Sequence, residues 1–67
     1  MEYLTIKEQE ILAGLKNIDS NRIDFNLITK ADIARQLNMQ VTNFYRILKN
    51  LARKGHINYK DNSITYN

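Results

Sequence analysis

Residues 41–54 constrain this chain of 67 residues most, because they have the pattern of an amphipathic helix. Apolar residues recur there at the spacing i, i+3, i+4 and i+7, which places them on one side of a helix. Gly55 predicts the end of that helix, since glycine adopts the left-handed conformation without a steric penalty. The opposite side is polar and free of carboxylates. The apolar residues are Phe44, Ile47, Leu48 and Leu51, and the polar ones are Thr42, Tyr45, Arg46, Lys49 and Arg53.

A shorter helix is expected immediately before this one, over residues 30–37. Thr29 precedes it, and Asp32 stands three residues later, in the position of a capping box. Asn38 follows, and asparagine is the commonest residue after glycine to accept a left-handed conformation, so we expect a sharp turn there. Ala34 is small at the point where the two helices would cross. Two helices joined by so few residues have the spacing of a helix-turn-helix.

The first third of the chain predicts a further helix and a short strand. Thr5 and Glu8 have the spacing of a capping box, and apolar residues at helical intervals predict a helix over residues 6–18. Gly14 within it is explained either by the close approach of another element or by chance. Residues 23–28 alternate between apolar and polar, which favours a strand; a loop held by its apolar side chains is the alternative.

The carboxy-terminal residues predict a two-stranded hairpin. Asp61 and Asn62 stand between two alternating runs, and both residue types accept the positive φ of a type I′ turn. We therefore expect an α+β fold, a winged helix-turn-helix. It consists of a three-helix core with a short strand and the carboxy-terminal hairpin as the wing, in a single domain over residues 1–67. The hairpin register pairs Ile57 with Tyr66, Tyr59 with Ile64, and Lys60 with Ser63.

Charge is distributed unevenly along the chain. Residues 1–29 carry three Lys and Arg against five Asp and Glu, a net charge of −2, whereas residues 30–67 carry seven against two, a net charge of +5. The second part is therefore expected to attract anions. The chain has no cysteine, and no apolar run reaches the roughly 18 residues needed to cross a membrane. We expect a cytoplasmic protein without a signal peptide, disulfides or a membrane partner.

Residues 29–57 resemble the helix-turn-helix of the catabolite-activator (Crp/Fnr) family and, more loosely, that of MarR-like regulators. The similarity is closest over residues 46–51, R-I-L-K-N-L. The resemblance implies that Val41, Thr42 and Arg46 touch base edges of DNA. Val41 and Thr42 replace the Arg and Glu of the best-known members, so the DNA sequence that is read would differ. The cyclic-nucleotide barrel and the long dimerisation helix of that family have no counterpart here, so no effector is implied.

A helix with one apolar and one cationic side is suited to the major groove of double-stranded DNA. The guanidinium of Arg46 has the geometry to pair with guanine O6 and N7. Packing at the edge of the core remains open for Tyr45, and a solvated side chain remains open for Lys54 and Lys60. The other candidates are Gln40, Asn43 and Tyr45 for hydrogen bonds near the helix start, Lys49, Arg53 and Lys54 for phosphates, and Thr29, Lys30 and Lys60 for the DNA backbone.

Nothing in the sequence indicates catalysis or a metal site. The chain has one histidine, His56, and it has no Gly-rich loop and no nucleophile–base pair. We therefore predict no enzymatic activity and no cofactor, but sequence-specific DNA binding, most simply by a small transcriptional regulator. The alternatives are a plasmid or phage replication or maintenance protein, and a winged helix that binds another protein. A homodimer through Tyr3, Leu4, the first helix or the wing edge, or an additional domain, would enlarge the small binding surface of one module.

Overall fold

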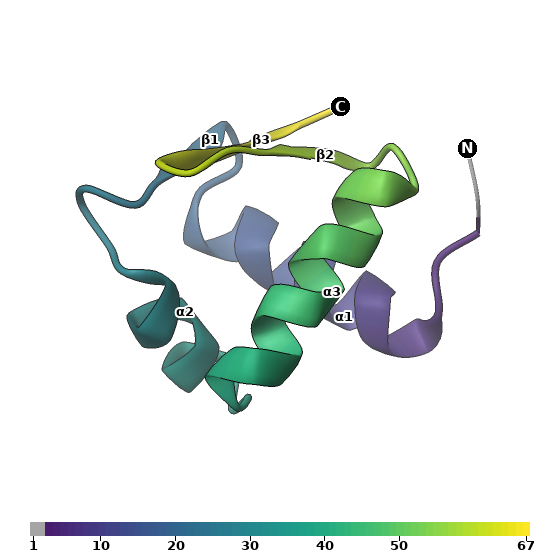
Figure 1. Ribbon diagram of the computed structural model, residues 1–67, viewed down its shortest axis with the longest axis horizontal. Coiled ribbons are helices and arrows are strands. Elements are labelled where there is room, and N and C mark those ends of the chain that lie inside the picture. Colours follow the sequence, from purple (N-terminus) through teal and green to yellow (C-terminus); the bar gives the residue numbers. More distant parts are fainter. Residues whose placement is uncertain (1–2) are drawn as a thin grey trace.

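The computed structural model of the chain describes residues 3–67, so Met1 and Glu2 of the domain expected over 1–67 lie outside it. Within the described residues, three helices and a three-stranded antiparallel sheet form a small α+β fold (Figure 1). The predicted order of helix, strand, two helices and hairpin is confirmed. The elements are α1 (Ile6–Ile18), β1 (Arg22–Asp24), α2 (Lys30–Gln36), α3 (Val41–Arg53), β2 (Ile57–Tyr59) and β3 (Ser63–Tyr66).

Helix α1 begins and ends at the residues that the sequence predicts. The Thr5 hydroxyl accepts a hydrogen bond from the Glu8 N–H at 3.1 Å, and the Thr5 N–H donates to Glu8 Oε1 at 2.9 Å. This is the predicted capping box, which satisfies two backbone donors at the helix start. Gly14 marks a close approach, because a Cβ there would lie 2.6 Å from Cδ2 of Leu37. Of the two explanations for Gly14, the structure supports the contact with a neighbouring element.

Helices α2 and α3 are joined by a tight turn. The Thr29 hydroxyl accepts the Asp32 N–H at 3.1 Å and caps α2, which ends one residue before the predicted Leu37. Asn38 has a φ of 56°, which confirms the left-handed residue expected there. The Met39 N–H then donates to the carbonyl of Ala34 at 2.8 Å, so the turn closes back on α2.

The core lies between the helices and one face of the sheet, since α3 packs against α1, α2 and β2. Figure 1 shows the helices on one side of the sheet. Ala34 is fully buried, as its small size at a helix crossing predicts, and Ile47 is only half-buried. No helix within residues 3–67 has the length and apolarity needed to span a membrane. The buried apolar residues are Ile11, Leu15, Ile23, Ile33, Ala34, Phe44, Leu48, Leu51, Ile57 and Ile64.

Strands β2 and β3 pair in the predicted register, with Ile57 opposite Tyr66 and Tyr59 opposite Ile64. The predicted type I′ turn is wrong, because neither central residue, Asp61 or Asn62, has the positive φ that this turn requires. The Asn62 carbonyl accepts a hydrogen bond from the N–H of Phe25 at 2.9 Å. A residue of the turn is therefore held by the chain beyond β1 as well as by the hairpin.

The strand predicted over residues 23–28 was too long. After β1 the chain turns, because the Asp24 carboxylate accepts the Asn26 N–H at 2.9 Å and the Asp24 carbonyl accepts the Leu27 N–H at 3.0 Å. An aspartate that bonds an amide two residues on forms an Asx-turn, which ends the alternation of a strand. Leu27 is consequently 85% exposed instead of facing the core. β1 pairs only with β3, so β3 is the central strand.

Tyr66 on β3 joins the sheet to the end of α1, and this contact predicts an alkaline transition. Its hydroxyl donates to the Asp19 carbonyl at 2.8 Å, and burial, with a smaller effect of the Asp19 charge, raises the pKa of Tyr66 to about 12 from 10.0. The folded state thus holds the phenolic proton more tightly than the unfolded chain does. The free energy of unfolding that this contributes is present below pH 10 and is lost as the pH rises towards about 12.

We expect Tyr66→Phe to lower stability near neutral pH by about 1 kcal/mol, because a hydrogen bond is removed. The same variant should lose less stability than the wild type between pH 10 and about 12, because the perturbed phenol is absent. Urea unfolding at several pH values, together with tyrosinate absorbance, measures both effects. Parallel stability curves for the two proteins above pH 10 would contradict the prediction.

Candidate nucleic-acid interface

Helix α3 has a buried side and an exposed polar side. Phe44, Leu48 and Leu51 are 0% exposed, because the sheet and the other helices cover them. Val41 is half-buried and packs against this core, so of the three residues expected at base edges, Thr42 and Arg46 alone are fully on the exposed side. The sequence predicted this division, except that Val41 and Ile47 are half-buried. The exposed residues of α3 are Thr42, Asn43, Tyr45, Arg46, Lys49 and Arg53.

The guanidinium of Arg46 is oriented by its own helix. Its Nη2 donates to Oδ1 of Asn43 at 3.0 Å, one turn earlier. This contact is exposed and leaves the other N–H groups of the fork available for a bidentate partner. No carboxylate occurs anywhere in α3, so no acidic residue of the helix itself lies beside the cations on its exposed side.

Lys30, at the start of α2, lies among three aromatic rings. Its ammonium is 5.0 Å from the ring centroids of Phe25 and Tyr59 and 5.5 Å from that of Tyr45. Phe25 and Tyr59 also meet edge to face, with centroids 6.4 Å apart and an interplanar angle of 82°. Such contacts attract a cation to the ring faces. Lys30 therefore connects α2 to α3 and to the hairpin through the aromatic cluster of Phe25, Tyr45 and Tyr59.

The aromatic cluster gives two of the candidate residues, Lys30 and Tyr45, contacts within the fold. Hydrogen bonding with the Tyr59 side chain is the main cause that raises the pKa of Lys30, so the ammonium stays charged through the physiological range. Tyr45 is 38% exposed, and its ring contacts Lys30. The sequence predicts a contact between Lys30 and the DNA backbone. It does not predict the aromatic cluster, because no periodic pattern brings Phe25, Tyr45 and Tyr59 together.

The remaining candidates lie around α3. Thr29 is exposed, although its hydroxyl is used in the cap of α2. Gln40 is exposed at the N-cap of α3 and makes no side-chain capping bond. Lys60 is exposed near the tip of the hairpin, next to Tyr59, and its N–H donates to the Ser63 carbonyl.

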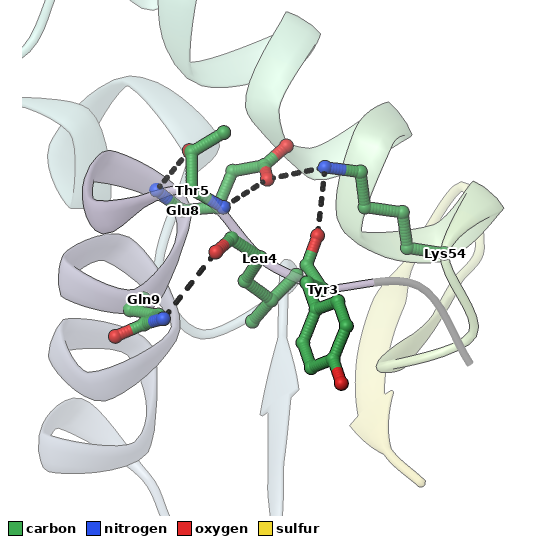
Figure 2. A network of polar contacts seen from close by, with 6 residues as sticks. All are labelled: Tyr3, Leu4, Thr5, Glu8, Gln9 and Lys54. Carbon is green, nitrogen blue, oxygen red and sulfur yellow. Dashed lines mark hydrogen bonds and ion pairs between the residues drawn. The ribbon is translucent and has the colours of Figure 1, made fainter.

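Lys54 differs from its expectation of a phosphate contact or a solvated side chain. Its ammonium forms an ion pair with Glu8 at 2.6 Å and donates to the Tyr3 carbonyl at 3.3 Å (Figure 2). The Lys54 and Glu8 side chains are only 12% and 5% exposed. Lys54 directly follows α3 and Glu8 is in the first turn of α1, so the pair connects the C-terminal end of α3 to the start of α1. Sequence spacing gives no signal for a contact between residues 46 positions apart.

Comparison with known proteins adds no assignment, because no protein-family model, curated protein or solved structure matches the chain. Among residues 3–67, no group of three or more histidine, aspartate or glutamate side chains is placed to hold a metal ion. The geometry of α3 and its surroundings is therefore what defines the candidate site.

The buried ion pair predicts a strong dependence on Glu8. The hydrogen bond from Lys54 is the main cause that holds the pKa of Glu8 below 4.5, so this stabilisation is present above pH 4.5 and is lost as the pH falls through the folded-state value. We expect Glu8→Gln to lower the free energy of unfolding by about 3 kcal/mol at neutral pH, because it leaves a buried ammonium without its counter-charge.

The matched control for Glu8→Gln is Glu10→Gln in the same helix. Glu10 is 4.0 Å from Lys7, and both side chains are more than half exposed. Such a pair contributes little, so this variant should change stability by less than about 1 kcal/mol. Urea unfolding at neutral pH compares the two, and equal effects would show that the Glu8–Lys54 pair does not hold α3.

The aromatic cluster predicts that Lys30 stabilises the fold through its charge. Lys30→Met should cost about 1 kcal/mol, because the cation–π contacts are lost while the aliphatic stem is kept. Lys30→Arg should retain most of the stability, and Lys60→Met, at an exposed site in the hairpin, should change it little. Thermal unfolding measures all three. A Lys30→Met variant as stable as Lys60→Met would contradict this role of the charge.

Proposed function

We propose that this chain binds double-stranded DNA in a sequence-specific manner, as a winged helix-turn-helix regulator of transcription. The observation that carries the proposal is α3, which buries Phe44, Leu48 and Leu51 while its exposed side presents Arg46 and Lys49 in a helix whose sequence holds no carboxylate. A helix of this width and charge fits the major groove, and counter-ion release from the phosphates favours the association.

The order and pairing of the elements support the winged-helix assignment. The turn at Asn38 sets α2 against α3, as in the helix-turn-helix that residues 29–57 resemble. Hairpin β2–β3 follows directly and would serve as the wing, with Lys60 near its tip. In this arrangement the second helix of the motif enters the groove and the wing contacts the adjacent backbone.

The exposed side chains divide into base-reading and backbone-contacting groups. Arg46 would pair with guanine, and the Thr42 methyl would meet a thymine methyl. Lys49 and Arg53 stand further along α3 and would meet phosphates, which fix position without reading sequence. The absence of any catalytic constellation in this set favours a binding role over an enzymatic one.

Selection of bound sequences from a random duplex pool tests the proposal. A single enriched motif is expected, and a palindrome would also indicate that the chain acts as a homodimer. Retention on random duplex at low salt, lost as salt rises, is expected of several phosphate contacts. A chain that binds no duplex at low salt would overturn the proposal and favour a protein-binding role.

Arg46→Ala and Lys49→Ala should differ in kind. Arg46→Ala is expected to cost about 1–3 kcal/mol on the selected sequence and to relax the preference at one base pair. Lys49→Ala should weaken binding to all sequences alike and lower the salt slope by about one. Fluorescence anisotropy on selected and random duplexes measures both. Equal losses for Arg46→Ala on the two duplexes would remove Arg46 from base reading.

A further inference from the structure

A helix in the major groove lies between two rows of phosphates, one on each side. The backbone-contacting candidates outside α3 would reach only one of these rows. Lys30 contacts Tyr45, and Lys60 is the next residue after Tyr59, which belongs to the same aromatic cluster. The candidates from α2 and from the hairpin therefore lie towards the side of α3 that carries Tyr45, here called the Tyr45 flank. Asn43 is two positions from Tyr45, ~200° around the helix, and so lies on the opposite flank. The residues that sequence reasoning selected beyond α3 leave that flank without a phosphate contact.

The opposite flank adjoins α1. A pocket of about 390 Å³ lies between the first turn of α1 and the turn that precedes α3. Its lining includes Lys7 and Arg46, with the side-chain amides of Asn38, Gln40 and Asn43, and no lining residue is acidic. Two cations and several amide donors around one pocket are the groups that bind a phosphate oxygen.

The geometry points to a second phosphate-binding site on this flank, in which Lys7 of α1 and Arg46 of α3 hold a phosphodiester of the second row. The inference rests on the proposed function and extends it to α1, which lies in the part of the sequence with a net charge of −2. Arg46 already turns towards Asn43, through the 3.0 Å hydrogen bond, and so towards the pocket. It can offer one N–H to a phosphate while the rest of the fork remains for a base.

The first turn of α1 has a defined position relative to α3. Glu8, the neighbour of Lys7, is bonded to Thr5 and to Lys54, as Figure 2 shows. Lys7 therefore belongs to a helical turn that the Glu8–Lys54 ion pair fixes against the C-terminal end of α3. Its own partner is Glu10, at 4.0 Å, with the two side chains 58% and 63% exposed. So long and exposed an ion pair is weak, and a phosphate would displace it.

The test compares Lys7→Met with Lys16→Met on a short random-sequence duplex. Lys16 is in the last turn of the same helix, with its ammonium 5.6 Å from the Tyr66 ring, and its loss changes the net charge equally. We expect Lys7→Met to lower the slope of log affinity against log salt by about one, and Lys16→Met to leave it unchanged. Thermal unfolding of both variants checks that the fold is retained, as the exposure of both lysines predicts.

Glu10→Gln gives a second measurement at the same site. It should raise the affinity for the duplex at low salt, because Glu10 then no longer competes with the phosphate for Lys7. The gain should vanish in a Lys7→Met background. An equal gain in both backgrounds, or equal slopes for Lys7→Met and Lys16→Met, would overturn the site while leaving the proposed function standing. A wild-type chain that binds no duplex would overturn the proposed function, and the site with it.

Discussion

Helix α3 packs through its apolar side against α1, α2 and β2, and this burial holds the small fold together. Phe44, Leu48 and Leu51 are 0% exposed, and full burial of three such side chains contributes about 5–9 kcal/mol. That is comparable with the whole stability expected of a domain of this size. α3 therefore cannot leave the core without unfolding it, and its polar side is presented to solvent as a consequence.

Two polar contacts then set the orientation of α3. At its end, the buried pair of Lys54 and Glu8 connects it to the first turn of α1. On its Tyr45 flank, Lys30 lies among rings from the segment after β1, from α3 and from β2. Hydrophobic burial is not directional. Contacts between specific charged and aromatic groups are directional, and they fix the orientation of the helix and the hairpin relative to each other.

These two contacts show that the position of a lysine in the sequence does not decide whether its ammonium group is engaged within the fold. Lys54 and Lys30 occur in the basic part of the sequence, yet their ammonium groups are engaged within the fold. Lys7 occurs in the acidic part, yet it shares a pocket with Arg46. The proposed DNA-binding surface is thus not the basic part of the sequence as a whole. It is the set of cations that the packing leaves on the exposed side of α3 and beside it.

Local rules were sufficient for most features that neighbours in sequence decide, and the exception is the Asx-turn at Asp24, which ends the predicted strand early. The bounds of α1, the caps at Thr5 and Thr29, the left-handed Asn38 and the register of the hairpin all depend on residues a few positions apart, so the sequence by itself determined them. Tertiary contacts decided the remainder. The hairpin turn is held by Phe25, and the half-buried Lys54 pairs with a carboxylate that lies 46 positions away. Such contacts depend on which surfaces, far apart in the sequence, come together in the fold. Neither the periodicity nor the helix and strand propensities of a short segment contain that information.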